Sequence, residues 1–167
     1  MGTLVVKTYR DGVAQRVGHD LVIDVGRWWA KIEVGDDGAP TSIAFEVDPI
    51  SLAVREGLGG VKPLTEKDRA GIGKDIDEKI LRGRPISFTS SALEQAGEQL
   101  TAIGQLTLVG ISRPASFQLH LSSDGHVTST LPVNQSEWGI KPYRAFMGAL
   151  KVRDTVEVVL DARLPVA

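Results

Sequence analysis

Apolar and polar residues alternate with a period of two along much of the first third of the chain. After a first short apolar run at residues 4–6, the alternation is clearest at residues 21–25, 28–34 and 43–47, and Asp36-Asp37-Gly38 supplies a turn signal between the last two. Successive side chains of a β-strand point to opposite faces, so this pattern predicts strands with one buried face. The chain therefore opens as an antiparallel meander.

The second half returns to the same alternation. Its predicted strands are 86–91, 100–108, 115–121, 127–133 and 156–160. Short turn signals such as Asp124-Gly125 join most of them, which gives roughly eight or nine strands connected mainly by hairpins. Since a closed sheet leaves no unpaired edge, we expect an all-β fold with a closed antiparallel up-and-down barrel of about eight strands.

One helix interrupts the strands, at about residues 65–82. Thr65 is a suitable N-cap, with Asp68 three residues later as a weaker form of the capping box. Isoleucines at 72, 76 and 80 place an apolar stripe on one face, and the charged residues on the remainder are typical of a solvated face. Gly83 and Pro85 are expected to end the helix.

Aromatic residues, which make up 5% of the chain, gather in the segment 137–154. Trp138, Tyr143 and Phe146 lie there within ten residues, and Trp138 is expected to end a strand before Pro142 fixes a turn. We expect residues 143–150 to form a compact apolar plug at one end of the barrel. Such a plug either closes a cavity or caps a solid core, and its spacing fits both.

The residues expected to point inward favour a cavity. A barrel of about eight strands is just wide enough to be filled by side chains or to hold one small ligand. Several inward positions carry small residues, which a solid core at native packing density would not gather together. They are Ala30, Ser90, Ala102, Gly104 and Ser129.

Length and composition are ordinary for a globular protein, and they exclude several classes. The 167 residues carry a net charge of −2, which gives no sign of nucleic acid or of an anionic membrane as the main partner. The absence of cysteine excludes disulfides and thiolate chemistry. The first residues lack the features of a signal peptide, and no apolar run is long enough for a membrane span. We expect a single domain over residues 1–167, located in the cytoplasm, without stable membrane insertion.

Signals for catalysis, metals or cofactors are weak. None of the common hydrolase, metalloprotease, phosphate-binding or dinucleotide-binding motifs occurs. His19 and Asp20 are adjacent, and neighbouring strand residues point to opposite faces, so they do not form an acid–base pair. His19 fits better as a polar residue at the rim, while His120 faces outward and His126 lies beside a turn. We therefore expect no metal, no cofactor and no catalytic residue.

Two stretches resemble the YceI-like family. The first is Phe88-Thr-Ser-Ser91 followed by the run from Leu100 to Ala115, which is similar to the family's central run of the form "FTST … G-LTL-G-T-RP". The second combines Trp138-Gly-Ile140, Ala145-Phe-Met-Gly148 and Val152-Arg-Asp-Thr-Val156, and it is similar to the C-terminal signature. Together they cover about half of the chain. The resemblance implies a lipocalin-like barrel that binds polyisoprenoids or other lipids.

Two regions indicate which branch of that family the chain is more similar to. The usual acidic and aromatic segment before the central run is replaced here by residues 78–88, and the early run 18–23 looks more like a cytoplasmic branch than a secreted one. These departures concern the identity of the ligand more than the fold.

The resemblance makes a carrier or sequestering protein for a long apolar lipid the leading hypothesis, with a polyisoprenoid, quinone or fatty-acyl ligand. Lys141 and Arg144 are the expected donors to an anionic head group. Tyr143 lies in the plug, and His19 lies at the rim. The expected wall consists of Trp28, Phe45, Phe88, Phe117, Leu119, Leu131, Trp138 and Phe146.

Two other classes stay open. The first is an enzyme acting on an apolar small molecule in the same cavity, with His19, Tyr143 or Glu137 as acid–base groups. The second is a packed barrel that serves as a stress-related or protein-interaction module. A homodimer formed through an outer face is compatible with each reading, and no residue identifies its interface.

Overall fold

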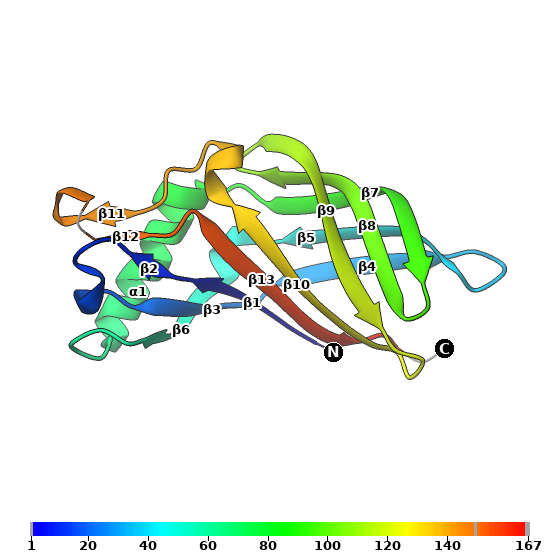
Figure 1. Cartoon of the computed structure of the whole chain (residues 1–167), viewed down its shortest axis with the longest axis horizontal. Helices are drawn as coiled ribbons and strands as arrows, with labels where there is room; N and C mark the ends of the chain where they lie inside the picture. Colours follow the sequence, from blue (N-terminus) through cyan, green and yellow to red (C-terminus); the bar gives the residue numbers. More distant parts are fainter. Residues whose placement is uncertain (1, 149, 166–167) are drawn as a thin grey trace.

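The protein is built on one large, strongly curled antiparallel sheet of ten strands (Figure 1). The computed structural model describes residues 2–148 and 150–165. The spatial order of the strands is β4-β5-β7-β8-β9-β10-β13-β1-β3-β6. Their bounds are β1 Gly2–Thr8, β3 Asp20–Val25, β4 Trp28–Val34, β5 Pro40–Val47, β6 Leu52–Leu58, β7 Ile86–Ala96, β8 Gln99–Leu108, β9 Ile111–Leu121, β10 His126–Asn134 and β13 Thr155–Arg163.

The expectation of an all-β fold with one helix is confirmed, and the expectation of a closed eight-stranded barrel is wrong. The sheet is a half-barrel of ten strands whose two edge strands are β4 and β6. Two breaks interrupt the strands in the first third of the chain, and β6, which follows the second break, is the strand that the sequence did not predict. One falls at Gly26 and Arg27, between β3 and β4, and the other falls at Asp48 to Ser51, between β5 and β6.

The two breaks lie side by side, and the long hairpin formed by β3–β4 and β5–β6 bends there. Gly26 N–H donates to the Ser51 carbonyl at 3.0 Å, and Asp48 N–H donates to the Arg27 carbonyl at 3.0 Å. The two strands therefore turn the corner together. Beyond it, β3 pairs with β1 on one flank of the half-barrel and β5 pairs with β7 on the other.

A second, small sheet lies with the helix at one end of the molecule, at the left of Figure 1. It contains β11 (Arg144–Ala145), β12 (Leu150–Val152) and β2 (Arg10–Asp11), in that order. Trp138 belongs to a 3₁₀ turn over Gln135–Trp138, so the expectation that it ends a strand is wrong. Tyr143 is 54% exposed and Met147 is fully exposed, so the described residues 143–148 do not form the compact apolar plug that was expected over 143–150.

The helix α1 (Glu66–Asp75) begins where the sequence predicts. The Thr65 hydroxyl accepts from Asp68 N–H at 3.1 Å, and the Asp68 carboxylate accepts from Thr65 N–H at 2.9 Å, so the capping box is complete. A π-helical turn over Ile76–Leu81 extends the helix. The chain then leaves through Arg82 and Gly83, both with positive φ.

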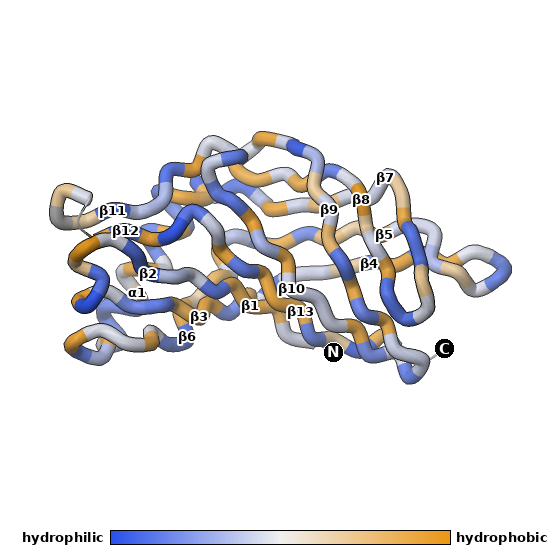
Figure 2. The backbone as a smooth tube through the Cα atoms, viewed as in Figure 1, coloured by the Kyte–Doolittle hydropathy of each residue, from blue (hydrophilic) through white to orange (hydrophobic). Residues whose placement is uncertain are grey.

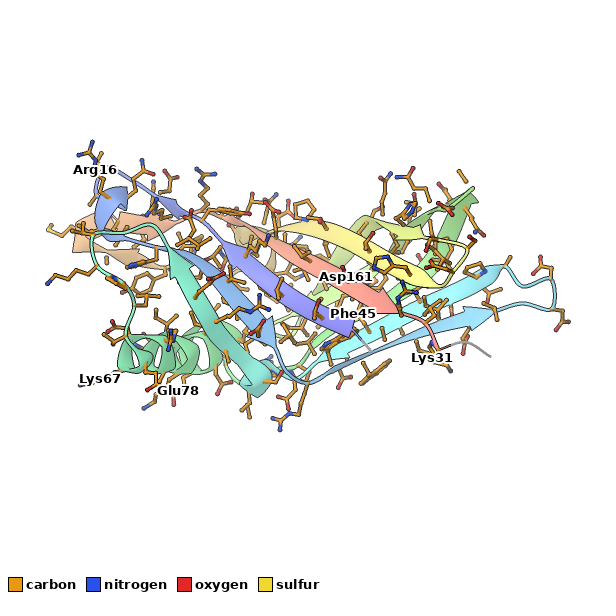
Figure 3. The ribbon with its side chains drawn as sticks, turned by 90° about the horizontal axis from the view of Figure 1, so that it is seen from below. Arg16, Lys31, Phe45, Lys67, Glu78 and Asp161 are labelled. Atoms are coloured by element: carbon orange, nitrogen blue, oxygen red, sulfur yellow. The ribbon has the colours of Figure 1, made fainter. Side chains whose placement is uncertain are left out.

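Apolar side chains from both flanks of the sheet form the core. The alternation of apolar and polar residues along the strands is visible in Figure 2. One cluster of buried residues includes Phe88, Leu100 and Trp138, and the other includes Ile23, Val47 and Leu81. The isoleucine stripe of the helix packs against the second cluster. In Figure 3, Phe45 lies within the curled sheet, whereas Lys67 and Glu78 project from the outer side of the helical segment.

Candidate functional site

A cavity of about 520 Å³ lies inside the curl of the sheet. Its wall is made by inward-facing residues of all ten strands of the large sheet and by the apolar stripe of the helix. The strands β6 and β7 contribute only their first residues, Leu52 and Ile86. Most of the lining side chains are aliphatic. Such an interior follows directly from the period-two pattern, because each strand places every second side chain on the concave face.

Five of the predicted wall residues line this cavity, namely Trp28, Phe45, Phe117, Leu119 and Leu131. Phe88 and Trp138 lie behind the wall instead. Phe88 is 1% exposed and Trp138 is 3% exposed, and both belong to the larger buried cluster.

Three phenylalanines form one aromatic cluster between the cavity and the core. The rings of Phe45 and Phe88 stack with centroids 5.5 Å apart, and Phe117 meets Phe88 edge to face at 4.8 Å. Such pairs add about 0.5–1.5 kcal/mol beyond the burial of their area. Phe88 thus supports the two rings that face the cavity.

Trp138 anchors the 3₁₀ turn that follows β10. Its indole N–H donates to the Leu106 carbonyl at 2.8 Å, which satisfies the polar group of a buried ring. The residue therefore stabilises the wall from behind.

The small residues expected to leave space do so at two of their five positions. Ala30 and Ser129 line the cavity. Gly104 is covered by Phe88, because a Cβ added there would lie 2.9 Å from the ring. The Ser90 hydroxyl accepts from Ile43 N–H at 2.8 Å and so completes the sheet at a register shift.

Polar lining residues gather at the end of the cavity that faces α1 and the small sheet. The residues of the polar end are Thr8, Arg10, His19, Asp75, Lys79, Gln135, Tyr143 and Lys151. The opposite end, near the first residues of β10 and the last residues of β13, is apolar except for Ser129.

Arg10 and His19 are held in fixed positions at the polar end. Arg10 donates to the Gly18 carbonyl at 2.9 Å, and its Nε lies 3.8 Å from the Asp20 carboxylate. His19 Nε2 lies 2.7 Å from the Lys62 carbonyl. The two side chains rest on Gly59 and Gly60, where any Cβ would collide with them.

The helical segment contributes a cation to the same end. Lys79 Nζ lies 2.9 Å from the Asp75 carboxylate, and this hydrogen bond raises the pKa of the Lys79 ammonium. The nearby Tyr143 phenol adds to the shift. Tyr143 also lines this end of the cavity.

The expected head-group donors are not in the cavity wall. Lys141 and Arg144 are exposed and do not line the cavity, and the side chain of Phe146 lies outside the described residues. The cations that do line it are Arg10, Lys79 and Lys151. Arg10 and Lys151 lie in strands of two and three residues, which are too short to show a period of two. Lys79 belongs to the charged run of the helix, and the expectation that this run is only a solvated face is wrong for Asp75 and Lys79, which line the cavity.

Thr8 is the other polar residue that sequence reasoning missed. Its hydroxyl is buried and has no hydrogen-bond partner among residues 2–148 and 150–165. A buried polar atom without a partner is costly. Because the oxygen itself is not exposed, a ligand can contact the hydroxyl only after the Thr8 side chain changes rotamer.

Within the described residues, no group of three or more His, Asp or Glu side chains is arranged to hold a metal ion. No helix in that part of the chain combines the length and hydrophobicity needed to cross a membrane.

A family model described as the YceI-like domain matches residues 79–164, just over half of the chain. The matched region runs from the π-helical turn through β13 and includes five of the ten strands of the large sheet, all of which line the cavity. A comparison with curated proteins found no match.

Solved structures with the same fold are distant in sequence. BcnA of Burkholderia cenocepacia is 14% identical, with a TM-score of 0.68 over 96% of this chain and 94% of that one. The YceI protein of Campylobacter jejuni is 10% identical, with a TM-score of 0.60 over 87% and 84%. A mutant of the Campylobacter protein with a monobromobimane guest is also 10% identical, with a TM-score of 0.62 over the same shares. At these identities the likeness concerns the fold.

Proposed function

This chain belongs to the YceI-like domain family, and from that premise we propose that it binds a long-chain apolar lipid in the cavity, as a carrier or sequestering protein. The observation that carries the proposal is the continuous aliphatic and aromatic wall, with polar side chains gathered at one end. An amphiphile has the same division between a long apolar part and a short polar part.

The wall supplies affinity for the apolar part. Burying a methylene gains about 0.8 kcal/mol. A chain of ten or more methylenes therefore gains roughly 8 kcal/mol or more, which offsets much of the cost of association. The tail would provide the affinity, and the polar end would orient the ligand.

The volume of the cavity limits the size of the ligand. A volume of about 520 Å³ lies within the range of about 300–1,000 Å³ that is usual for small-molecule sites. A fatty-acyl chain or a short isoprenoid suits a cavity of that size, whereas a long polyisoprenoid or quinone tail would extend beyond it.

The polar end is suited to the head group. Arg10 and Lys79 are paired with acids, and Lys151 adds a third cation without an ion pair in the described part of the chain. The net balance at this end favours a head group with one negative charge. Lys141 and Arg144 would then act outside the cavity wall.

The enzyme alternative has less support. The candidate acid–base groups do not form a pair, since His19 Nε2 is engaged by the Lys62 carbonyl. Glu137 is exposed, lies outside the cavity and is 3.4 Å from the Asn134 amide. Binding is the function that the arrangement favours.

A substitution that fills the cavity tests the proposal. Ala30 lines the cavity on β4, and Ala30→Phe would occupy space that the lipid needs. We expect its affinity for a straight-chain or short isoprenoid lipid to fall by at least roughly tenfold, because a phenylalanine side chain displaces several methylenes of ligand. Displacement of a fluorescent fatty-acid analogue measures this.

The matched control is Ala44→Phe. Ala44 lies on β5 between Ile43 and Phe45, so its side chain is on the outer face of the sheet. This variant should bind lipid like the unchanged protein. Equal affinities of the two variants, with both folded, would remove the cavity as the binding site.

A further inference from the structure

Three loops surround the polar end of the cavity. They are residues 12–18 between β2 and β3, residues 58–64 between β6 and α1, and residues 143–148 around β11; we call them the rim loops. Figure 1 shows the segments that carry them together at the left end of the molecule. Direct contacts join them to one framework, because Gly18 packs on Leu150 and Gly57 packs on His19 and Leu64.

The rim loops carry an unusual share of the exposed apolar surface. Val13 is 94% exposed, Val61 is 71% exposed and Met147 is fully exposed. Ten large apolar side chains are substantially exposed in the described residues, and six of them belong to or border these loops, the other three being Val17, Leu58 and Tyr143. Exposed apolar groups gathered in one place mark a site of interaction.

The charge of the rim loops is opposite to that of the whole chain. The three segments contain Arg16, Lys62 and Arg144 and no acidic residue, whereas the chain carries a net charge of −2. All three cations are exposed, and none forms an ion pair within residues 2–148 and 150–165. Figure 3 shows Arg16 projecting from this end.

The acidic residues that flank the loops do not cancel this charge. The flanking carboxylates keep their charge, but they are outnumbered. Residues 10–20, 58–69 and 141–153, which contain the rim loops and their flanks, carry nine Lys or Arg residues and four acidic ones, Asp11, Asp20, Glu66 and Asp68. This end of the molecule is therefore positive.

We propose that the rim loops dock the protein on the surface of an anionic lipid bilayer, with the apolar tips entering the interface and the cations contacting the head groups. Exposed apolar side chains interleaved with Lys and Arg are the composition of peripheral membrane-binding surfaces. Tyr143 adds an aromatic side chain of the kind that favours the interface.

This surface is continuous with the cavity. Val17 and Tyr143 are exposed on the rim loops and also line the cavity at its polar end. Docking would bring that end against the bilayer, where a lipid can pass between membrane and protein without crossing water. The inference goes beyond the proposed function, because it concerns the membrane surface and not the bound ligand.

Flotation with vesicles tests the inference on the full chain. The probes are vesicles of phosphatidylcholine alone and vesicles containing about 30% phosphatidylglycerol. We expect binding to the second kind, with an affinity that falls as salt is raised, since exposed charges are screened. Arg16→Gln with Lys62→Gln should weaken binding by roughly tenfold or more, because each cation near such a surface contributes strongly.

Matched control variants test whether binding depends on the rim loops or is nonspecific adsorption to the vesicles. Lys31→Gln with Arg113→Gln changes the net charge equally at exposed positions outside the rim loops, and it should leave binding unchanged. Val13→Ser with Met147→Ser should weaken binding, whereas Val34→Ser with Ile50→Ser should not. Equal effects of rim and control variants, or no binding to either vesicle, would overturn the proposal. Since flotation measures docking alone, that outcome would leave lipid binding in the cavity to its own test.

Discussion

At the scale of single residues, Thr8 carries the polar atom that an empty cavity leaves unsatisfied. Its hydroxyl lies buried at the polar end without a partner in the described part of the chain. An unmade hydrogen bond of this kind costs about 1–3 kcal/mol, and a ligand that accepts from the hydroxyl recovers part of that cost.

Thr8→Val should therefore separate stability from binding. We expect the melting temperature of the lipid-free protein to stay the same or rise, because the buried hydroxyl is replaced by a methyl group. The affinity for a lipid with a hydrogen-bonding head group should fall by roughly fivefold, which corresponds to one hydrogen bond. Thermal unfolding and lipid titration measure the two quantities.

The control is Thr130→Val, at an exposed position of β10 that does not line the cavity. It should change neither quantity appreciably. A Thr8→Val protein that is less stable and binds lipid with unchanged affinity would show that the hydroxyl serves the fold instead of the ligand.

Which face of the sheet a side chain lies on could be predicted from the sequence more easily than how deeply it is buried. Alternation correctly placed Phe88 and Gly104 on the concave side, but they fill each other's space, since the ring lies over the glycine. A small residue in a strand leaves a cavity or receives a neighbouring ring, and only the packing distinguishes the two. Ala30 and Ser129 are the positions where space remains.

At the scale of elements, the helix could be predicted closely because the residues that start it interact with near neighbours in the sequence. The capping box uses Thr65 and Asp68, which are three residues apart, and the apolar stripe repeats within the helix itself. The helix packs against β6, so its position affects the cavity wall through Ile72, Ile76 and Ile80.

Thr65→Ala should destabilise the protein by about 1 kcal/mol, because it removes the side-chain acceptor of the N-cap. Amide hydrogen exchange should speed up first in the opening turn of α1, at residues 66–69. Thr65→Ser keeps the hydroxyl and should restore most of the protection. Unchanged exchange in that turn would contradict the role given to the cap.

The strand β6 could not be predicted in the same way. Its end overlaps the glycine cluster 57–60, which is typical of a loop. Gly57 is nevertheless part of the strand, because it pairs with Leu21 of β3. Leu64 and His19 approach it so closely that a Cβ would collide with them. The turn at Trp138 was missed for a related reason, since its indole is fixed by Leu106, which is distant in sequence.

At the scale of the whole molecule, the bent hairpin decides the architecture. Counting alternating runs predicts a barrel. It does not show that the chain bends between β3 and β4 and again between β5 and β6, at the same point of one long hairpin. The result is an open-edged half-barrel that still encloses a cavity of about 520 Å³. Closure of the sheet is not required for an interior of that size.

The two ends of the cavity suit different parts of a lipid. The apolar end suits the end of a lipid tail, and the polar end suits its head group. The rim loops lie outside the polar end, with exposed apolar tips and cations. Entry of the lipid tail first through that end is consistent with both features.

The measurement that tests the central claim most directly is native mass spectrometry of the purified full chain after incubation with single-chain lipids of increasing length. We expect one lipid per chain, with retention increasing with chain length until the tail fills the cavity and levelling off beyond that length. A clean lipid-free mass across the whole series of fatty-acyl, quinone and isoprenoid lipids would contradict the claim.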